Sequence, residues 1–393
     1  MRDKVIIQKE LRVMEIAIIG GGIGGLCAAV TLQKQGFSVN VYEAASTFQP
    51  VGAGIGIGSN AMQALMNIGV GEKVFTNGNV LHNQVFLNDK GRILNSIDFS
   101  LLKERFGQEN ITIHRADLHR TFLEALEPNT VHYNKKCVNV VQNGDQVTTY
   151  FEDETEVTVD LLIAADGIHS PIRKKLVPNS EPRYSGYTCW RGITENRGKV
   201  DEFTSTEIWS TTGRFGMAPM KDERVYWFAC INAREKDLFY QHIESNEIAN
   251  LFKDFPKVVP ELIRETQPEH VLHHDIYDIK PLRQFIFDRI VLLGDAAHAT
   301  TPNMGQGAGQ AIEDAIVLGN AFGEFTDVKK ALAFYEEKRV ARTAKVINLS
   351  RQIGVAAQFR SRSLASTRDF LFPFIPSKLL LWRLKFLFDV KLK

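Results

Sequence analysis

The sequence contains few cysteines and no excess of charge of one sign. Cys27, Cys137, Cys189 and Cys230 are far apart and form no CxxC pair. This spacing argues against a disulfide framework and against a zinc site, so we expect a reducing, cytoplasmic compartment. Forty-seven basic residues against forty-six acidic ones leave a net charge of +1, which does not favour nucleic acid as a partner.

Segments typical of membrane insertion are also missing. The first ten residues are basic but lack a sustained apolar core and a small-residue cleavage site, so we expect no signal peptide. Residues 1–13 are interpreted as an extension before the first strand. The apolar stretch 370–388 is interrupted by two prolines and three basic residues, which excludes a transmembrane helix. We expect it to dock on the protein's own core, with contact to a membrane surface as the alternative.

The first motif combines a strand, a glycine turn and a helix. An apolar run at residues 16–19 leads into Gly20, Gly22 and Gly25, which satisfy GxGxxG, and residues 26–35 continue as a helix. The glycines permit close approach of a pyrophosphate, which the helix N-terminus stabilises through unpaired N–H groups and its dipole. A second strand ends at Glu43, whose carboxylate can accept both hydroxyls of an adenosine ribose. This acidic residue favours NAD or FAD over NADP.

Three further segments have the composition expected near a cofactor. Residues 51–58 are rich in glycine, including Gly54, and a helix is expected to follow. We expect the stretch 111–126 to return to a helix, with Asp117 as its N-cap. Arg115 lies just before that cap, where its guanidinium can reach a phosphate or a flavin edge. An apolar strand at 161–165 ends at Asp166-Gly167.

The fourth segment, residues 290–310, combines an apolar strand with a glycine-rich helix start. The strand ends at Gly294-Asp295, and Gly305, Gln306, Gly307 and Ala308 follow Pro302. Their N–H groups at a helix N-terminus can stabilise the negative charge at the N1–C2 edge of a reduced flavin.

Taken together, these ordered motifs resemble the flavin-dependent aromatic hydroxylases, the single-component monooxygenases that include para-hydroxybenzoate, salicylate and urate hydroxylases. The resemblance covers roughly residues 14–390, and residues 184–190 also resemble zeaxanthin epoxidase. It implies that the GxGxxG glycines and Glu43 bind the ADP part of FAD and that Arg115 contacts the flavin side. It also implies a role for Asp166 with FAD and NAD(P)H, and binding of the ribityl chain by Gly294 and Asp295. The other residues expected to contact FAD are Ile23, Gly24, Ala44, Gly54 and Val138.

The absence of a second GxGxxG motif indicates that NADH or NADPH visits transiently as the reductant. The resemblance implies that the reduced flavin traps O2 as a C4a-hydroperoxide and passes one oxygen atom to the substrate. Exclusion of water from that intermediate would then be required.

The substrate site is expected on an antiparallel sheet above the flavin. Residues 80–99 predict a hairpin, and residues 207–231 predict three short strands. On the second of these strands, Arg214 shares a face with two small residues, so its guanidinium can fix an anion, with a structural ion pair as the alternative. Tyr226 can orient or deprotonate a phenol, and ordinary core packing is its alternative. Pro302 lines the reactive side of the ring or serves only as a turn residue.

Histidine gives weaker signals. We expect His298 to support the flavin turn by packing or hydrogen bonding rather than by transferring protons. The cluster His273-His-Asp275 lacks further ligands, so no metal site is expected.

The length of 393 residues suggests two domains in an α/β fold, with a Rossmann-like FAD-binding domain interleaved with an antiparallel-sheet substrate domain and followed by C-terminal helices. The expected FAD-binding domain is discontinuous. Its segments are 14–79, 100–182 and 283–326, the substrate domain comprises 80–99 and 183–282, and the C-terminal helical part is 327–393.

The predicted function is FAD-dependent, NAD(P)H-using monooxygenation of a small aromatic or heteroaromatic substrate with O2. Two alternatives stay open: an epoxidase or hydroxylase of a non-aromatic or polycyclic compound, and a non-catalytic FAD-binding carrier or regulatory protein. A halogenase is disfavoured because no WxWxIP segment occurs.

Overall fold

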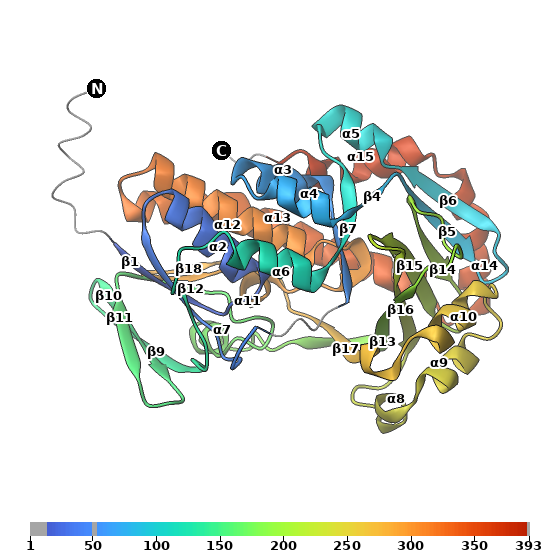
Figure 1. Cartoon of the computed structure of the whole chain (residues 1–393), viewed down its shortest axis with the longest axis horizontal. Helices are drawn as coiled ribbons and strands as arrows, with labels where there is room; N and C mark the ends of the chain where they lie inside the picture. The colour runs from blue at the N-terminus through green and yellow to red at the C-terminus, as the bar shows by residue number, and fades with distance from the viewer. Residues whose placement is uncertain (1–13, 49–52, 391–393) are drawn as a thin grey trace.

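The computed structural model describes residues 14–48 and 53–390, so the extension 1–13 and part of the 51–58 glycine segment lie outside it (Figure 1). A six-stranded sheet has the order β18-β19-β12-β1-β2-β8, parallel except for β18. Its apolar strands are buried on both faces, as parallel strands between helices require. The strands are β1 (Glu15–Ile19), β2 (Ser38–Tyr42), β8 (Val131–His132), β12 (Leu161–Ala164), β18 (Ile286–Phe287) and β19 (Ile290–Leu292).

Helices cover this sheet (Figure 1). α2 and α12 pack closely because a methyl group on Gly319 would lie 2.3 Å from Thr31 Cγ2, so only glycine permits that approach. The helices of this half are α2 (Ile23–Lys34), α3 (Ser59–Asn67), α4 (Gly71–Asn77), α6 (Arg115–Leu123), α7 (Pro171–Leu176), α11 (Asp295–His298) and α12 (Gly307–Glu324).

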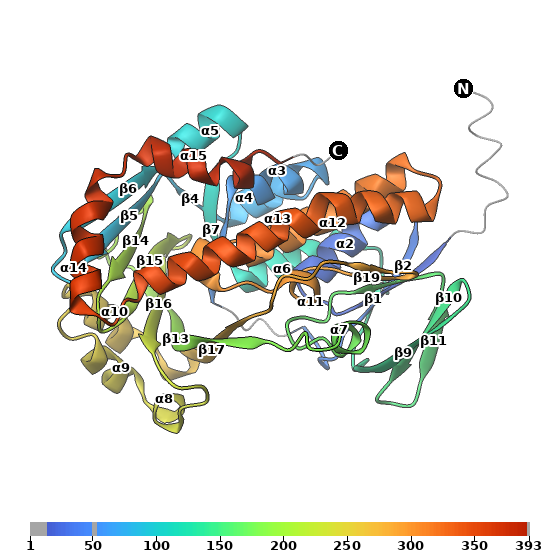
Figure 2. The ribbon, with the colours of Figure 1, turned by 180° about the vertical axis from the view of Figure 1, so that it is seen from behind.

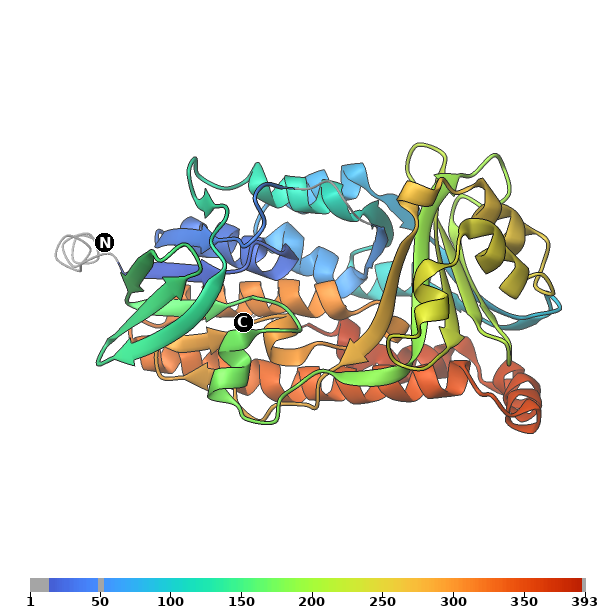
Figure 3. The same cartoon turned by 90° about the horizontal axis from the view of Figure 1, so that it is seen from below.

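A seven-stranded sheet lies at the other end of the molecule (Figure 3). Its order is β17-β13-β16-β15-β14-β5-β6, and one face packs against α9 and α10 through Phe215, Trp227 and Phe252. The expected 80–99 hairpin is present as β5 and β6, but β5 pairs in parallel with β14 because the hairpin enters the sheet from a distant part of the chain. The elements are β5 (Asn83–Asn88), β6 (Ile93–Asp98), β13 (Arg183–Glu195), β14 (Thr204–Trp209), β15 (Arg214–Met220), β16 (Arg224–Asn232), β17 (Leu272–Asp278), α8 (Leu238–His242), α9 (Ser245–Leu251) and α10 (Val258–Glu265).

Two three-stranded sheets complete the strands. The helix expected over residues 111–126 is wrong for its first part, because residues 110–114 form a strand that is buried except at its last residue and pairs with the glycine-rich strand β3. The helix begins only at Arg115. The strands are β3 (Gly54–Ile57), β4 (Asn79–Leu81), β7 (Asn110–His114), β9 (Cys137–Asn143), β10 (Gln146–Phe151) and β11 (Glu156–Val159).

The long helix α13 joins the two halves, running from α12 to the seven-stranded sheet (Figure 2). Its buried Tyr335 donates a hydrogen bond to Leu292 O at 2.9 Å, which fixes the helix to β19. The Rossmann-like and sheet architecture expected from the sequence, with C-terminal helices, is confirmed. The remaining elements are α5 (Ser100–Phe106), α13 (Val328–Ala357), α14 (Arg362–Leu371), α15 (Ser377–Phe388), η1 (Pro268–His270), η2 (Pro302–Met304) and η3 (Phe372–Phe374).

Within the described part of the chain, no helix has both the length and the apolar character needed to cross a membrane.

Candidate functional site

The turn after β1 forms a cradle that only glycine can build. Gly20 has φ +105°, and a methyl group there would lie 2.4 Å from Ala165 O. A methyl group on Gly25 would lie 2.0 Å from Gly20 O. Gly22 caps α2 without any side-chain hydrogen bond, no acidic residue occupies the first turn, and no atom lies within 4 Å of its would-be Cβ. The first N–H groups of α2 therefore face open space and can bind an anion.

Glu43 lies beside this turn at the end of β2. Its Oε2 accepts from Gly21 N at 2.7 Å and its Oε1 accepts from Ala45 N at 2.8 Å, so the backbone holds the carboxylate in place. The neighbouring Ala44 is exposed.

Asp166 follows β12 on the same edge of the sheet. Both of its carboxylate oxygens are buried without a hydrogen-bond partner among the described residues. Loss of hydration raises the pKa of this carboxyl, while the nearby Ser170 hydroxyl, backbone N–H groups and the charge of Arg173 oppose that shift. Val138, on β9, is exposed, while its neighbour Cys137 lies near Asp166.

Arg173 ties the Asp166 segment to the Gly294-Asp295 segment. It is fully buried and donates to Ile168 O at 2.5 Å, Asp295 O at 3.4 Å and Ala296 O at 3.3 Å. Two cofactor-type segments more than a hundred residues apart are therefore fixed relative to one another.

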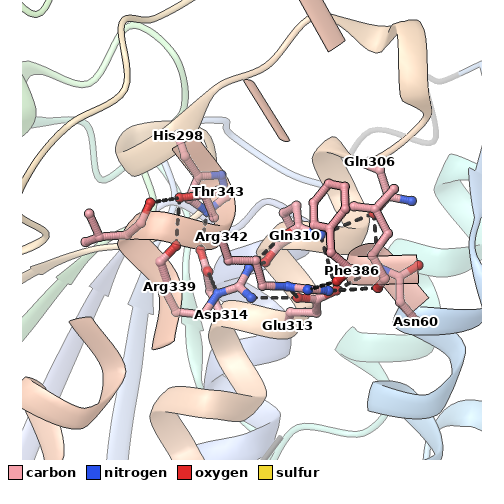
Figure 4. A network of polar contacts seen from close by, with 12 residues as sticks. Asn60, His298, Gln306, Gln310, Glu313, Asp314, Arg339, Arg342, Thr343 and Phe386 are labelled. Atoms are coloured by element: carbon pink, nitrogen blue, oxygen red, sulfur yellow. Dashed lines mark hydrogen bonds and ion pairs between the residues drawn. The ribbon is translucent and has the colours of Figure 1, made fainter. Parts of the chain in front are cut away.

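A buried polar network supports the turn that contains Gly294 (Figure 4). Asp314 Oδ2 accepts from Gly294 N at 2.9 Å and contacts His298 Nε2 at 2.5 Å, while its Oδ1 accepts from Arg339 Nε at 2.5 Å. Burial opposes ionisation of Asp314, but His298 and Arg339 lower its carboxyl pKa. His298 supports the Gly294 turn through its contact with Asp314, as expected, and the role of that turn toward a flavin stays a prediction.

The same network reaches the N-terminus of α12. Glu313 accepts from Asn60 Nδ2 at 2.7 Å and pairs with Arg339 at 2.6 Å, and Asn60 also donates to Gln306 Oε1 at 3.0 Å. Gln306 is the N-cap of α12 but makes no side-chain cap, and Gly305 has φ +61°. No atom lies within 4 Å of a would-be Cβ on Gly305 or Gly307. The first N–H groups of α12 are thus free for a ligand.

These features fit FAD. The open N-termini of α2 and α12 suit the pyrophosphate and the electron-rich flavin edge, and the unpartnered oxygens of Asp166 suit a hydroxyl-bearing ligand. The predicted residues are also brought together: a methyl on Gly24 would lie 2.9 Å from Leu293 and 3.1 Å from Ala311, so the pyrophosphate turn packs on the Gly294 segment. Asp295, at the start of α11, is an exposed residue. The protein atoms packed around its carboxyl group still limit hydration, and this raises the carboxyl pKa.

One face of the seven-stranded sheet carries the predicted substrate residues. Arg214 lies opposite Cys230, Gly216 opposite Phe228, and Ala218 opposite Tyr226. A methyl on Gly216 would lie 2.1 Å from the Phe228 ring, which occupies the space that glycine leaves. The Phe228 ring therefore fills part of the space that the small residues leave beside Arg214. The Arg214 guanidinium carbon lies over this ring, 5.3 Å from its centroid.

Arg214 is 1% exposed, and its Nε and Nη1 have no hydrogen-bond partner among the described residues. Glu207 lies 3.4 Å from Nε, close enough for charge compensation but outside hydrogen-bond geometry. Burial works against the cation, yet Glu207 and Cys230 raise its pKa, so the guanidinium stays charged. Arg214 has both an ion-pair partner and free donors for a ligand.

Tyr226 packs against the glycine-rich strand of the other half. A methyl on Gly54 would lie 2.5 Å from Tyr226 Cβ, so Gly54 permits the two halves to meet there. Burial raises the pKa of the Tyr226 phenol, while Arg191 opposes that shift. Tyr226 therefore keeps its proton at neutral pH.

Pro302 begins η2, a short turn anchored to both the sheet and α13. The next residue, Asn303, accepts from Tyr187 OH at 3.0 Å and donates to Ser350 O at 2.9 Å. The positive charge of Arg214 lowers the pKa of the Tyr187 phenol, against the larger effect of burial. Pro302 is exposed beside this junction, which places the turn near the Arg214 face.

Arg191 is a residue that sequence reasoning missed. It lies on β13 opposite Phe228, on the face that carries Arg214, and its side chain interacts with Cys189 on the same strand. The positive charge of Arg191 lowers the pKa of Tyr226 and of His274, and Arg115 also lowers the pKa of His274. In the sequence, the alternation of Cys189, Arg191 and Ile193 shows that these residues share one face of a strand. It does not show which strands pair with it, so it could not place Arg191 beside Arg214.

Two smaller expectations are corrected or tested. Asp117 is not the N-cap of α6: His114 takes that role and accepts from Ala116 N, because the strand continues through His114. Asp117 instead lies in the first turn and pairs with Arg120 at 3.4 Å. Arg115 is the first residue of the helix.

His273 contacts Thr188 Oγ1 at 2.6 Å, and the residues that the structure describes contain no group able to hold a metal ion.

A protein-family model described as an FAD-binding domain matches residues 13–350. The chain belongs to this family. Among its relatives, the aurachin C monooxygenase/isomerase of Stigmatella aurantiaca is 34% identical over 91% of this chain and 93% of that protein. An FAD-dependent urate hydroxylase of Klebsiella pneumoniae is 32% identical over 86% of this chain and 89% of that protein.

A solved structure supports the same assignment. The Klebsiella pneumoniae HpxO structure, complexed with FAD and uric acid, matches with a TM-score of 0.89 and 28% identity over 97% of this chain and 98% of that one. This FAD-binding-domain protein is a flavoprotein monooxygenase whose cofactor is FAD.

Proposed function

We propose that this FAD monooxygenase inserts one oxygen atom of O2 into a small, anionic aromatic or heteroaromatic molecule, with NADH or NADPH as a transient reductant. The observation that carries the proposal is the fully buried Arg214 with two free donors on the sheet face. The names of relatives that act on urate or aurachin C support a heteroaromatic substrate.

When bound, FAD supplies the activation of dioxygen that no amino-acid side chain can provide. The Gly20–Gly25 turn and Glu43 would hold its ADP part, with Ile23, Gly24, Ala44, Arg115 and Val138 as further predicted contacts. Asp166, Gly294 and Asp295 would hold the middle of the cofactor, and the residues from Gly305 to Ala308 would hold the flavin edge.

The protein's own residues would bind and orient the substrate. Arg214 would fix an anionic oxygen, and Arg191 would add a second positive charge on the same face. Because the Tyr226 phenol keeps its proton, we infer that it donates a hydrogen bond to a substrate oxygen rather than acting as a base from the outset. Pro302, held by Asn303, would close the opposite side against water.

The discontinuous division into an FAD-binding domain, a substrate domain and a C-terminal helical segment is part of this proposal. Its support is that residues 80–99 and 183–282 supply the seven-stranded sheet. The four cysteines, all without a disulfide, support the proposed cytoplasmic location.

A panel of anionic substrates tests the proposal. The FAD-loaded protein would be mixed with NADH or NADPH and each member of a set of hydroxypyridines, hydroxyquinolines, purines and hydroxybenzoates, with oxygen uptake recorded. We expect one compound class to stimulate oxygen uptake strongly, and neutral analogues without the anionic group to stimulate it less. An equal response to the neutral analogues would contradict the anionic assignment.

A further inference from the structure

The C-terminal part of the chain carries a charge that the rest does not. Residues 359–393 contain eight basic residues and two acidic ones, whereas the whole chain has a net charge of +1. The preceding 358 residues therefore carry a net negative charge. Five of the basic residues and one of the acidic ones lie on α14 and α15, which with the uncharged η3 lie at the end of the molecule opposite the N-terminus and along one edge (Figures 1 and 2).

The inner side of this segment is fixed to the protein. Asn95 Nδ2 donates to Phe372 O at 2.8 Å and to Ile375 O at 2.9 Å. The Phe372 ring stacks on Trp209 with a centroid distance of 5.2 Å and an interplanar angle of 6°. Arg342 donates to Leu387 O at 2.7 Å. The segment is thus held in a defined orientation and presents its other side outward.

That outer side is unusually apolar. Among the described residues, twelve large hydrophobic side chains are exposed, and six of them lie between positions 364 and 382. Phe374 is 71% exposed and Trp382 is 66% exposed. A cluster of this kind marks an interaction site, because single exposed apolar residues are normally scattered. We call these six residues the apolar patch: Leu364, Phe370, Leu371, Phe374, Leu379 and Trp382.

Basic side chains flank the patch on α15. At 100° per residue, Trp382 and Leu379 share one helix face, with Lys378 and Lys385 on one side and Arg383 on the other. All five are exposed. Long basic side chains on both flanks of an apolar stripe can reach lipid headgroups while the stripe enters the acyl boundary.

We propose that α14, η3 and α15 dock on an anionic lipid surface, with the apolar patch inserted at the headgroup level. The positive segment complements anionic headgroups, and an exposed tryptophan beside lysines is typical of a membrane interface. A second copy of the chain fits less well, because lysine is depleted from protein–protein interfaces. The dock involves none of the residues proposed for FAD or substrate, so it stands independently of the proposed function.

Vesicle binding by the FAD-loaded full chain tests the dock. Vesicles of equal parts phosphatidylglycerol and phosphatidylcholine should sediment with the protein, whereas pure phosphatidylcholine vesicles should bind it at least about tenfold more weakly. Raising the salt concentration should weaken binding. Trp382 reports insertion, because Trp190, Trp209 and Trp227 are buried: brominated lipids should quench its fluorescence.

Matched variants separate the contributions. Phe370→Ser with Phe374→Ser should lower anionic-vesicle binding about tenfold or more, and Lys378→Glu with Lys385→Glu should do the same. Phe239→Ser is the control, because Phe239 is 60% exposed on α8 outside the patch. FAD content and cofactor-dependent oxygen uptake should stay unchanged in every variant.

Two results would overturn the dock. One is equal binding to anionic and neutral vesicles without quenching of Trp382. The other is a dimer of the intact chain, seen by sedimentation velocity without lipid, that the Phe370→Ser, Phe374→Ser variant converts to a monomer while vesicle binding is absent.

Discussion

At the scale of single residues, Arg214 has the least complete surroundings on the substrate face. A buried guanidinium is costly unless acceptors match its donors, and Glu207 compensates the charge without accepting a hydrogen bond from Nε. An anionic ligand would complete the set of acceptors. Arg191, on β13, adds a second positive charge to the face that carries Arg214.

We expect Arg214→Gln to bind the stimulating substrate about 10- to 100-fold more weakly, because a hydrogen bond to a charged group contributes about 1.5–3 kcal/mol. Titration of the flavin absorbance measures the affinity. FAD content should match that of the parent protein, and Arg264→Gln, an exposed arginine on α10, is the control. Loss of FAD in Arg214→Gln would show that this residue belongs to the cofactor site.

Asp166 gives a second residue-scale prediction. Since burial raises its pKa in the folded state, the carboxyl favours folding at low pH, and this contribution is lost as the pH rises through the folded pKa. In the FAD-free protein, Asp166→Asn should therefore raise the melting temperature increasingly above about pH 4. The same change should weaken FAD binding.

Thermal unfolding of both FAD-free proteins from pH 4 to pH 8 measures the effect, with Asp160→Asn as an exposed-edge control. A melting-temperature difference that is constant across this range would contradict the assigned burial of the Asp166 carboxylate.

At the scale of elements, two helix N-termini would form the ends of the proposed cofactor site. α2 and α12 both begin without a side-chain cap and without acidic residues in the first turn. The α12 end is held by Glu313 and Asp314, which both pair with Arg339 (Figure 4). Arg342 also pairs with Glu313, and His298 contacts Asp314. The turn before α2 is held by close glycine contacts, by Glu43, which accepts from Gly21 N, and by His119, which contacts Gly21 O. Gly22 itself has open space around it, so this end is the easier one to test.

Gly22→Asp should fold normally, because nothing lies within 4 Å of the new Cβ and the backbone φ is −73°. The aspartate would cap α2 and stabilise the FAD-free protein by only about a few tenths of a kcal/mol, because glycine is itself a tolerated N-cap. Its charge would repel a pyrophosphate at the same place, so FAD should be lost. Gly22→Ala, which adds volume without charge, should retain FAD; retention by Gly22→Asp would contradict the phosphate site.

Patterns within one segment were predictable from the sequence, and contacts between segments were not. The GxGxxG turn, the strand ending at Asp166 and the Gly294-Asp295 turn follow from local alternation and glycine spacing. The position of Arg191 beside Phe228, and of Asp314 under Gly294, depends on strand register and helix packing across many residues. The strand at 110–114 was missed because its partner, β3, lies more than fifty residues earlier.

At the scale of the whole molecule, the proposed reaction site is the junction of two halves. The parallel sheet and its helices would hold FAD, the seven-stranded sheet would supply the substrate face, and α13 spans both. Gly54 against Tyr226 and Asn303 against Tyr187 are the contacts that close this junction. Chemistry at such a seam can exclude water while each half keeps its own core.

Isotope labelling tests the central claim most directly. The FAD-loaded protein would react with NADH or NADPH and the stimulating compound under ¹⁸O₂, and mass spectrometry would follow the product. The account predicts one ¹⁸O atom in each product molecule and loss of product in Gly22→Asp. Product that carries oxygen only from water, or FAD-dependent oxygen uptake that no compound stimulates, would contradict it.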